Sequence, residues 1–351
     1  MILPPECNSS FSEKLVDAMV EYEVDDNRGS STLASELLDN TREFFTSGAE
    51  KFRSNFGERN YEERPQQSAM AQAVAKALTE GSNLCVEAPT GVGKSFAYLV
   101  PLFFRASQCA LPALVSTGTI TLQEQLLHKD IPLLKKLTGL DVKCALAKGR
   151  RNYLCLRRFE MLCGEEKDAL LPIPSMVVDL DRLQRGVDNG FSGEADDPSL
   201  RIDPQLWNMV CCETGNCMGP KCSFFRKCYY YRARKQWDEA DIVVANHALF
   251  FTDLAMRNED GTGSMLPNYG VVLIDEAHTL EDHAADHLGL HLAEYALIGT
   301  LNRLFNPDNA KGILMRGGSS YLELRKMMAD LRAEAYRFFG TYSDYLDEQV
   351  A

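Results

Sequence analysis

The sequence predicts an α/β protein in which a parallel sheet carries a phosphate-binding loop at its edge. A glycine-rich loop ending in Lys94-Ser95 lies between a short apolar run and an apolar helical run. A second apolar run, Val271–Ile274, ends in the carboxylates of Asp275 and Glu276. Strand-like and helix-like runs alternate between these motifs, as is typical of a parallel sheet with helices on both faces.

The loop before the helical run has the composition of a phosphate site. Its glycines leave backbone amides free to face an anion. Lys94 can reach the β- and γ-phosphates of a nucleotide, and Ser95 can ligate Mg²⁺ at the helix N-terminus. A glycine-rich turn without a ligand is the alternative. The predicted cofactor-binding residues are Ala88, Pro89, Thr90, Gly91, Val92, Gly93, Lys94 and Ser95.

The downstream acidic motif completes this prediction. An apolar strand that ends in carboxylates places them at the edge of the sheet where open α/β folds bind ligands. Asp275 suits Mg²⁺, Glu276 suits activation of a water molecule, and His278 can couple the site to another element. An acidic pair after a strand is also a common helix N-cap. Together with the loop, however, the motif predicts a nucleoside triphosphatase, with Lys94, Asp275, Glu276 and His278 as catalytic residues.

The remaining elements follow from hydrophobic periodicity. Helices are expected at 66–78, 96–104 and 122–136, and further helices after Leu280. Strands are expected at 84–86, 113–117, 142–147, 242–245 and 271–274. Residues 148–239 break this alternation and hold most of the cysteines, so they read as an insertion in the α/β domain.

Composition limits the class of protein. The chain has 351 residues, of which 45% are hydrophobic and 25% charged, and this length suggests two or three domains. No apolar run approaches the roughly 20 residues that span a bilayer. The first ten residues do not resemble a signal peptide, so we expect a cytoplasmic protein without a membrane partner. A net charge of −13 argues against a uniformly basic surface, so any nucleic-acid site must be local.

Eleven cysteines are unevenly placed along the chain. Cys217, Cys222 and Cys228 are clustered, and Cys155 precedes them. Thiolates suit zinc or an iron–sulfur cluster. Wide spacing favours a [4Fe-4S] cluster, because zinc sites usually present two short C-x₂₋₄-C pairs. Zinc, a disulfide framework, and ligation by Cys211 or Cys212 remain alternatives.

Basic and aromatic residues are interleaved around these cysteines. Cations that track phosphates and rings that stack on bases are what a single-strand channel requires. Alternatively, the rings form a small core and the cations coat it. The candidate DNA contacts in this stretch are Arg150, Arg151, Tyr153, Arg226, Lys227 and Tyr230.

The motifs, in this order, resemble the DinG/XPD-type iron–sulfur DNA helicases of superfamily 2, over residues 60–290. Residues 61–67 resemble the family's adenine-side motif, with Arg64 and Gln67 as base contacts. Residues 116–126 resemble a motif that touches the DNA backbone, with Thr119 and Gln123 as candidates. Residues 88–95 resemble motif I, and Asp275–His278 resemble the DEAH box. The cluster cysteines lie between residues 116–126 and the DEAH box, as they do in the family.

The resemblance implies an ATP-driven motor that moves 5′ to 3′ on single-stranded DNA and unwinds forked or damaged duplexes. It implies Mg²⁺, ATP and a [4Fe-4S] cluster held by Cys155, Cys217, Cys222 and Cys228. It also implies a bacterial-type, monomeric protein with single-strand-binding or repair partners. The fold would be a RecA-like motor domain at 61–147 and 240–285, an iron–sulfur domain at 148–239, and the start of a helical arch at 286–351. A helical segment of unassigned function would precede them at 1–60.

The family's second RecA-like domain carries an arginine motif, Q-x-x-G-R-x-x-R. No such run follows His278, so we expect the N-terminal half of a helicase with weak activity on its own. The alternative is a non-catalytic module that binds single-stranded DNA and nucleotide and is stabilised by its cluster.

Overall fold

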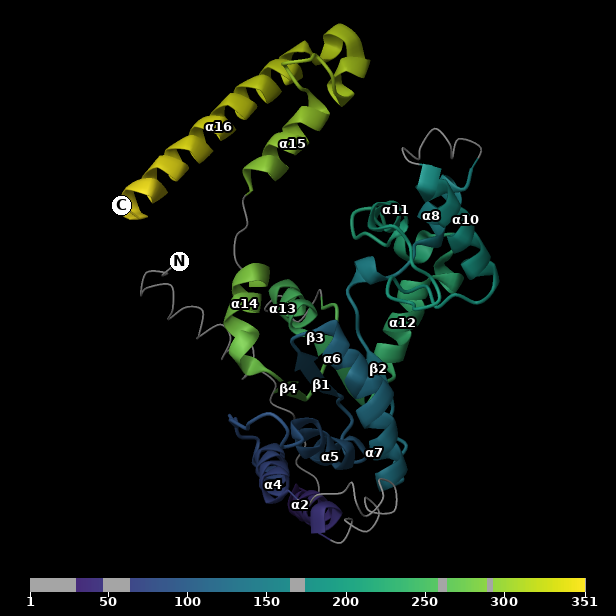
Figure 1. Cartoon of the computed structure of the whole chain (residues 1–351), viewed down its shortest axis with the longest axis vertical. Coiled ribbons are helices and arrows are strands. Elements are labelled where there is room, and N and C mark those ends of the chain that lie inside the picture. Colours follow the sequence, from purple (N-terminus) through teal and green to yellow (C-terminus); the bar gives the residue numbers. More distant parts are fainter. Residues whose placement is uncertain (1–29, 47–63, 165–173, 258–263, 289–292, 351) are drawn as a thin grey trace. The chain divides into compact units, whose positions relative to one another are not determined.

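The computed structural model describes residues 30–46, 64–164, 174–257, 264–288 and 293–350 (Figure 1). The chain forms two compact units, residues 1–287 and 288–351, and the division falls two residues after the predicted start of the arch at 286. Of the predicted N-terminal segment 1–60, the structure describes α2 (Ser30–Thr46). The rest of that segment, and Tyr61, Glu62 and Glu63 of the predicted adenine-side motif, lie outside the described residues.

The centre of the first unit is a four-stranded sheet with the strand order β2-β3-β1-β4. Its strands are β1 (Ala113–Thr117), β2 (Cys144–Leu146), β3 (Ile242–Asn246) and β4 (Val271–Ile274). All three strand pairs are parallel, with Ala113 opposite both Ile242 and Val271. The carboxyl ends of the strands therefore meet at one edge, and the predicted α/β class with a parallel sheet is confirmed.

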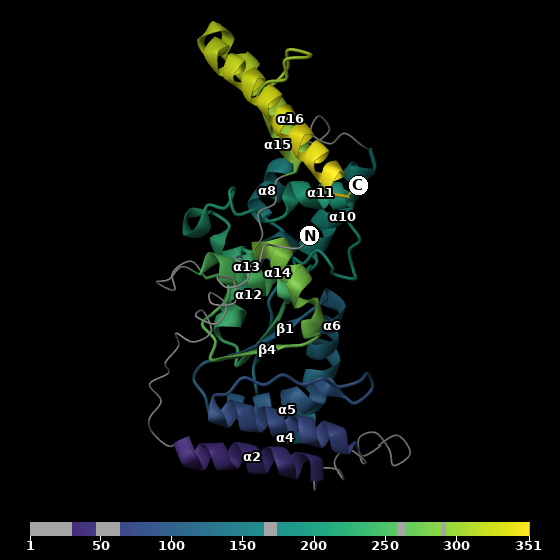
Figure 2. The ribbon, with the colours of Figure 1, turned by 90° about the vertical axis from the view of Figure 1, so that its left-hand side faces the viewer.

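Helices cover both faces of this sheet, which explains why all five residues of β1 and the first four of β3 are buried. α5 (Lys94–Ala106) packs on one face and buries Leu99, Val100 and Phe103. α4 (Pro65–Glu80) and α2 follow outward from α5, as Figure 2 shows. α13 (His247–Met256) packs against β1 and β3 on the opposite side. The main core therefore lies between α5 and the sheet.

The helix after β1 contains an irregular turn. α6 (Ile120–Gln125) begins after Thr119, whose hydroxyl accepts a 3.3 Å hydrogen bond from the backbone N–H of Leu122. A π-helical turn, η1 (Leu126–Asp130), follows and leads into α7 (Ile131–Thr138). The predicted helix at 122–136 is thus present, but its middle is not α-helical. Such π turns occur frequently at functional sites.

The strand predicted at 84–86 is wrong. Residues 82–89 have no regular structure, and Leu84 and Val86 are 46% and 40% exposed. A strand needs a paired neighbour and a covering layer, and no described strand pairs with this run. Three apolar residues are too few for periodicity to separate a buried strand from an exposed loop.

Residues 148–239 build a core of their own next to β2. Their helices are η2 (Arg150–Asn152), α8 (Leu156–Leu162), α10 (Pro174–Asp188), α11 (Pro204–Val210), η3 (Gly219–Lys221), η4 (Phe225–Lys227) and α12 (Tyr229–Asp238). Leu154, Phe159, Met176, Leu180 and Leu183 form the centre of this second core. We call residues 148–239 the cysteine domain.

The second unit is helical, as predicted for the sequence after Leu280. α14 (Leu280–Leu288) closes the first unit, and α15 (Glu294–Leu304), η6 (Ile313–Tyr321) and α16 (Leu322–Val350) follow. α15 and α16 pack against each other. Within the described ranges, no helix combines the length and the apolar character needed to cross a membrane.

Candidate nucleotide site and cysteine pocket

Two glycines shape the phosphate-binding loop. Gly91 and Gly93 have φ of 86° and 84°, a region that favours glycine. Gly93 caps α5, so that Lys94 and Ser95 form its first turn and the N-terminal backbone amides are available to an anion. A Cβ atom at Gly93 would collide with the side-chain amide of Gln67. This glycine is therefore required both by its backbone conformation and by a close neighbour.

The two predicted base contacts support this loop from α4 and its N-cap. The Gln67 side-chain amide donates a 2.9 Å hydrogen bond to the carbonyl of Gly93. The Arg64 guanidinium donates a 2.6 Å hydrogen bond to the carbonyl of Gly91. Both residues thus lie beside the loop and are hydrogen-bonded to its backbone, and their contact with a base stays a prediction.

The structure brings the loop lysine and the acidic motif together. Lys94 Nζ lies 3.4 Å from Glu276 Oε1, and both side chains are about one-third exposed. Glu276 has a left-handed backbone conformation with φ of 55°, which is strained for a residue with a side chain. His278 Nδ1 lies 3.5 Å from Glu276 Oε2, although the histidine ring is largely exposed. Lys94, Glu276 and His278 therefore form one charged cluster at the sheet edge.

A residue that sequence reasoning missed, Tyr98, holds the other carboxylate. Its hydroxyl donates a 3.0 Å hydrogen bond to Asp275 Oδ2, and its ring is buried. Burial raises the pKa of Asp275, and this hydrogen bond opposes the rise. Burial and the nearby Asp275 raise the pKa of Tyr98, so it remains a donor. The available signal was the position of Tyr98, one helical turn after Lys94.

A second missed group, Asp130, is buried at the end of the π-helical turn that packs against α5. Asp130 is only 5% exposed, and its carboxyl group interacts with the side chains of Gln125 and Ser95. Burial raises the pKa of this carboxyl group, and the contact with Gln125 opposes the rise. In the sequence, an aspartate interrupts the apolar stripe made by Leu126 and Leu134, which was the signal that could have found it.

A buried histidine joins the ends of the central strands. His247 Nδ1 lies 2.7 Å from Ser116 Oγ, and its ring lies 5.3 Å from the ring of His283. Burial and the neighbouring His283 lower the pKa of His247. Sequence reasoning missed this pair because Ser116 and His247 are 131 residues apart.

Five cysteines of the cysteine domain line one pocket. They include the four predicted cluster ligands and one alternative, and they are Cys155, Cys212, Cys217, Cys222 and Cys228. Cys211, the other alternative, is buried and does not line the pocket; its thiol faces the carbonyl of Asn208. The fold thus brings Cys155 into one pocket with three later cysteines of the predicted set, and their ligation of a cluster stays a prediction.

The thiols in this pocket differ in their electrostatic surroundings. Cys212 interacts with both Cys155 and Cys228, and these contacts lower the pKa of Cys155 and of Cys228 to about 6. The same contacts raise the pKa of Cys212. Backbone amides at the starts of α8 and α12 also face Cys155 and Cys228. Such amide donors stabilise thiolates, which is the form that ligates metals.

The pocket chemistry suits a thiolate-ligated cluster, whose four cysteines surround several iron atoms. In the part of the chain that the structure describes, no group of three or more His, Cys, Asp or Glu side chains has the arrangement that holds a metal ion. The cysteines share one pocket, and the cluster is proposed below from their number and chemistry.

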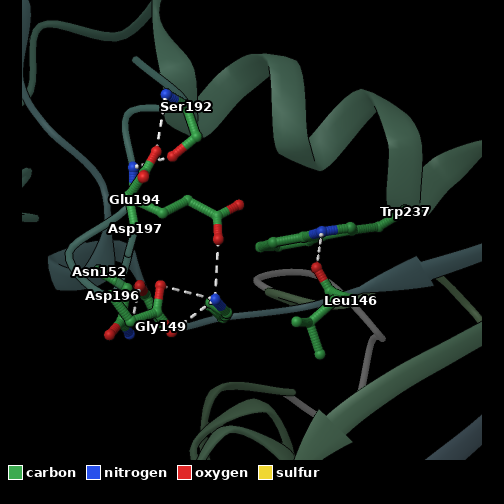
Figure 3. A network of polar contacts seen from close by, with 9 residues as sticks. Leu146, Gly149, Asn152, Ser192, Glu194, Asp196, Asp197 and Trp237 are labelled. Carbon is green, nitrogen blue, oxygen red and sulfur yellow. Dashed lines mark hydrogen bonds and ion pairs between the residues drawn. The ribbon is translucent and has the colours of Figure 1, made fainter. Parts of the chain in front are cut away.

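A buried lysine at the start of the cysteine domain, two residues after β2, pairs with two carboxylates of that domain, Glu194 and Asp196, which Figure 3 shows. Lys148 Nζ lies 2.7 Å from Glu194 Oε2 and from Asp196 Oδ2, and its side chain is 4% exposed. Nearby, Trp237 Nε1 donates a 2.9 Å hydrogen bond to the carbonyl of Leu146 in β2. The Trp237 hydrogen bond thus fixes the cysteine domain to the sheet, and the ion pairs hold the first residue of the domain to its residues 194 and 196.

Three predicted DNA contacts are corrected by burial. Gln123, Tyr153 and Tyr230 are each at most 2% exposed and cannot meet a DNA strand. The rings of Tyr153 and Tyr230 are 5.7 Å apart and pack with Trp237, so these aromatics form the small core that was the alternative. The guanidinium of Arg150 lies over the Tyr230 ring. The candidates that are exposed are Thr119, Arg151, Arg226 and Lys227.

Comparison with known families agrees with this geometry. The family pattern described as DEAD/DEAH box helicase matches residues 64–184, which contain the phosphate loop. The pattern described as DEAD_2 matches residues 216–297, which contain three pocket cysteines and Asp275–His278. The chain belongs to the DinG-type helicases of superfamily 2.

Several curated proteins are similar to this DinG-type chain. ATP-dependent DNA helicase YoaA of Haemophilus influenzae is 35% identical over 240 residues, covering 68% of this chain and 36% of the relative. ATP-dependent helicase DinG of Mycobacterium tuberculosis is 36% identical over 246 residues, covering 66% of this chain and 36% of the relative. The protein named 3′-5′ exonuclease DinG of Bacillus subtilis is 30% identical over 299 residues, covering 82% of this chain and 31% of the relative. The chain thus spans about a third of the length of these relatives.

Proposed function

We propose that this chain supplies the nucleotide, cluster and DNA-entry sites of an ATP-dependent DNA helicase. The observation that carries the proposal is the charged cluster at the sheet edge, where Lys94 lies 3.4 Å from Glu276. The loop lysine and the acidic motif come from segments 182 residues apart and meet where α/β folds bind nucleotides. The names of the helicase relatives support DNA as the substrate.

Each residue of the proposed nucleotide site has a role that follows from its chemistry. Lys94 leaves Glu276 and pairs with the phosphates when the nucleotide enters, because their charge exceeds that of one carboxylate. Glu276 is then free to orient and deprotonate the attacking water. Ser95 and Asp275 would hold Mg²⁺, which neutralises phosphate charge. Arg64 and Gln67, which support the loop, are placed to contact the base, and His278 couples the site to another element.

The cysteine pocket supports a [4Fe-4S] cluster in the proposed protein. Cys155, Cys217, Cys222 and Cys228 would hold it, and four thiolates match this cluster type. Cys212, the fifth cysteine of the pocket, would stay outside the ligand set, because this cluster type takes four thiolates. The cluster would tie together four segments of the cysteine domain.

The proposed substrate is single-stranded DNA, entered from a forked or damaged duplex. Thr119, Arg151, Arg226 and Lys227 are exposed and suit contacts to the phosphate backbone. We propose 5′ to 3′ movement, a monomeric state, a role in repair, and action in the bacterial cytoplasm, all from the resemblance and the bacterial relatives. Unwinding is proposed for the whole protein, because this chain covers about a third of its relatives' length.

Binding measurements on the chain and unwinding by the longer protein test this proposal. A fluorescent ATP analogue should bind wild type in Mg²⁺ and lose at least about tenfold in affinity in Lys94→Ala, because a phosphate-binding lysine contributes more than 1.4 kcal/mol. Lys76→Ala, on the exposed side of α4, is the matched control. The full-length protein should unwind a 5′-tailed duplex in ATP. Equal unwinding of 3′-tailed duplexes would contradict the polarity, and equal binding by Lys94→Ala would contradict the nucleotide site.

A further inference from the structure

Cys217 differs from the other three predicted cluster ligands in its surroundings. Cys155 and Cys228 lie at the N-caps of α8 and α12, and Cys222 lies at the end of η3. Cys217 is exposed and lies outside the described helices. Its backbone N–H donates a 3.4 Å hydrogen bond to the carbonyl of Thr214, three residues earlier. Such a local turn does not fix the distance from Cys217 to Cys155, so a contact of longer range is needed.

Arg157 supplies a contact of this kind. It lies in the first turn of α8, two residues after Cys155. Its Nη2 atom donates a 2.6 Å hydrogen bond to the carbonyl of Asn216, the residue before Cys217. The two partners are 59 residues apart in the sequence, and both line the cysteine pocket. One hydrogen bond thus joins the chain beside Cys155 to the chain beside Cys217.

A second arginine of α8 reaches Asn216 through a carboxylate. The side-chain amide of Asn216 donates a 2.7 Å hydrogen bond to Glu213 Oε2, and Arg158 Nη1 lies 2.9 Å from the same oxygen. Arg158 also donates a 2.7 Å hydrogen bond to the carbonyl of Cys211. Asn216 is therefore tied to α8 through its backbone and, by way of Glu213, through its side chain.

We propose that Arg157 is a positioning residue that holds Cys217 near Cys155 and thereby keeps the iron–sulfur cluster in the pocket. This inference rests on the proposed function, because it assumes that both cysteines ligate the cluster. A hydrogen bond from a charged donor is stronger than one from a neutral donor. Without it, the exposed segment is free to move, and its thiolate leaves the metal atoms more often. Partners that hold metal ligands in place contribute to metal retention in this way.

Retention of iron by the whole chain tests the proposal. Anaerobically purified protein is mixed with excess EDTA, and the release of iron is followed with time. Arg157→Met keeps an apolar stem and removes the donor, so iron should leave about tenfold faster, the lower end of the usual effect of losing a partner behind a metal ligand. Arg157→Lys keeps a cationic donor and should stay within about threefold of wild type. Arg201→Met, at an exposed arginine of the same domain, is the matched control.

A core variant separates positioning from a general loss of stability. Leu180→Val removes one methylene group from the core of the cysteine domain and leaves the pocket residues unchanged. It should lower the urea midpoint of the loaded chain at least as much as Arg157→Met does, because it trims a buried side chain. The fluorescence of Trp207 and Trp237, which lie in this domain, reports that midpoint. Its iron should nevertheless leave within about twofold of the wild-type rate, since no contact of a ligand segment is lost.

Release that is at least about threefold faster in Arg157→Met, with recovery in Arg157→Lys, supports the proposal. A smaller increase overturns it. An Arg157→Lys variant that behaves like Arg157→Met overturns it as well, because the donor would then have no role. Equally fast release from Leu180→Val also overturns it, because a loss of stability alone would then explain the effect.

Two further results separate this inference from the proposed cluster. A wild-type chain that contains no iron would overturn both. A loaded wild type with an unchanged Arg157→Met variant would overturn the inference alone. If circular dichroism shows that Arg157→Met is unfolded, Arg157→Gln is used instead; it has a shorter stem and no charge. The same threefold criterion, about the effect expected for a partner behind a metal ligand, then applies to the release of iron.

Discussion

The hydroxyl of Tyr98 donates a 3.0 Å hydrogen bond to Asp275, and this contact joins the helix after the phosphate loop to the end of β4. The two residues come from segments 177 residues apart. Because Tyr98 is almost fully buried, the contact fixes the Asp275 carboxyl group before any ligand arrives. Tyr98 of α5 therefore holds Asp275 of the acidic motif in position.

Replacing Tyr98 by phenylalanine should destabilise the first unit. Tyr98→Phe keeps the ring packing and removes the donor, leaving a partly buried carboxylate with one partner fewer. We expect a loss of about 1.5–3 kcal/mol in the free energy of unfolding, the usual range for hydrogen bonds to charged groups. Urea unfolding followed by far-UV circular dichroism measures it. Tyr295→Phe, at an exposed tyrosine, is the control and should change little.

Two glycines of the phosphate loop should tolerate alanine to different degrees. Gly91→Ala and Gly93→Ala both force a side chain into a positive-φ backbone, at about 1 kcal/mol each. Only at Gly93 would the new Cβ collide with Gln67, whereas nothing lies near it at Gly91. Gly93→Ala should therefore lose more affinity for a fluorescent ATP analogue. Equal losses in the two variants would show that the Gln67 contact does not shape the loop.

The Lys148 network should dominate the stability of the cysteine domain. Lys148→Met removes the cation between Glu194 and Asp196. The side chains of these two residues are about one-third exposed, so solvent screens part of their charge. We expect a loss of about 2–3 kcal/mol, somewhat below the cost of breaking a fully buried pair. Trp207 and Trp237, the two tryptophans of the chain, lie in this domain, so fluorescence in urea reports its unfolding. Lys143→Met, at an exposed lysine, should leave the midpoint unchanged.

Of the pocket cysteines, we expect Cys222 to bind the iron–sulfur cluster and Cys212 not to bind it. Iron and acid-labile sulfide are measured on anaerobically purified protein. We expect about four of each per chain for wild type and for Cys212→Ala, and loss of both for Cys222→Ser. A Cys212→Ala variant without iron would place Cys212 among the ligands. About one zinc per chain without sulfide would replace the cluster by a zinc site.

The elements that position the nucleotide site could be predicted from the sequence because their signals are local. β1, β3 and β4 each begin with at least three consecutive apolar residues, and the loop glycines favour the positive φ that the loop requires. The family assignment rested on the order of these motifs and is confirmed. The run at 84–86 is also apolar, but it has only three residues. No described strand pairs with it, and Leu84 and Val86 are exposed, so it does not form a strand.

The contacts between side chains could not be predicted, because they depend on partners far away in the sequence. Tyr98, Asp130 and His247 are ordinary residues of helices until the fold places carboxyl and hydroxyl groups beside them. Tyr153 and Tyr230 illustrate the opposite error. An aromatic ring has the same sequence signature whether it stacks on a base or fills a small core, and here packing with Trp237 decides.

The position of the cysteine domain in the chain has a mechanical consequence. The domain leaves the sheet from β2, an edge strand with three residues in its ladder, and returns through α12 into β3. A pulling force on the domain would load the β2–β3 ladder, the Lys148 ion pairs and the Trp237 hydrogen bond first. β1 and β4, which carry Ser116 and lead into Asp275, lie beyond that ladder. The proposed nucleotide site is thereby separated from strain that arises in the cysteine domain.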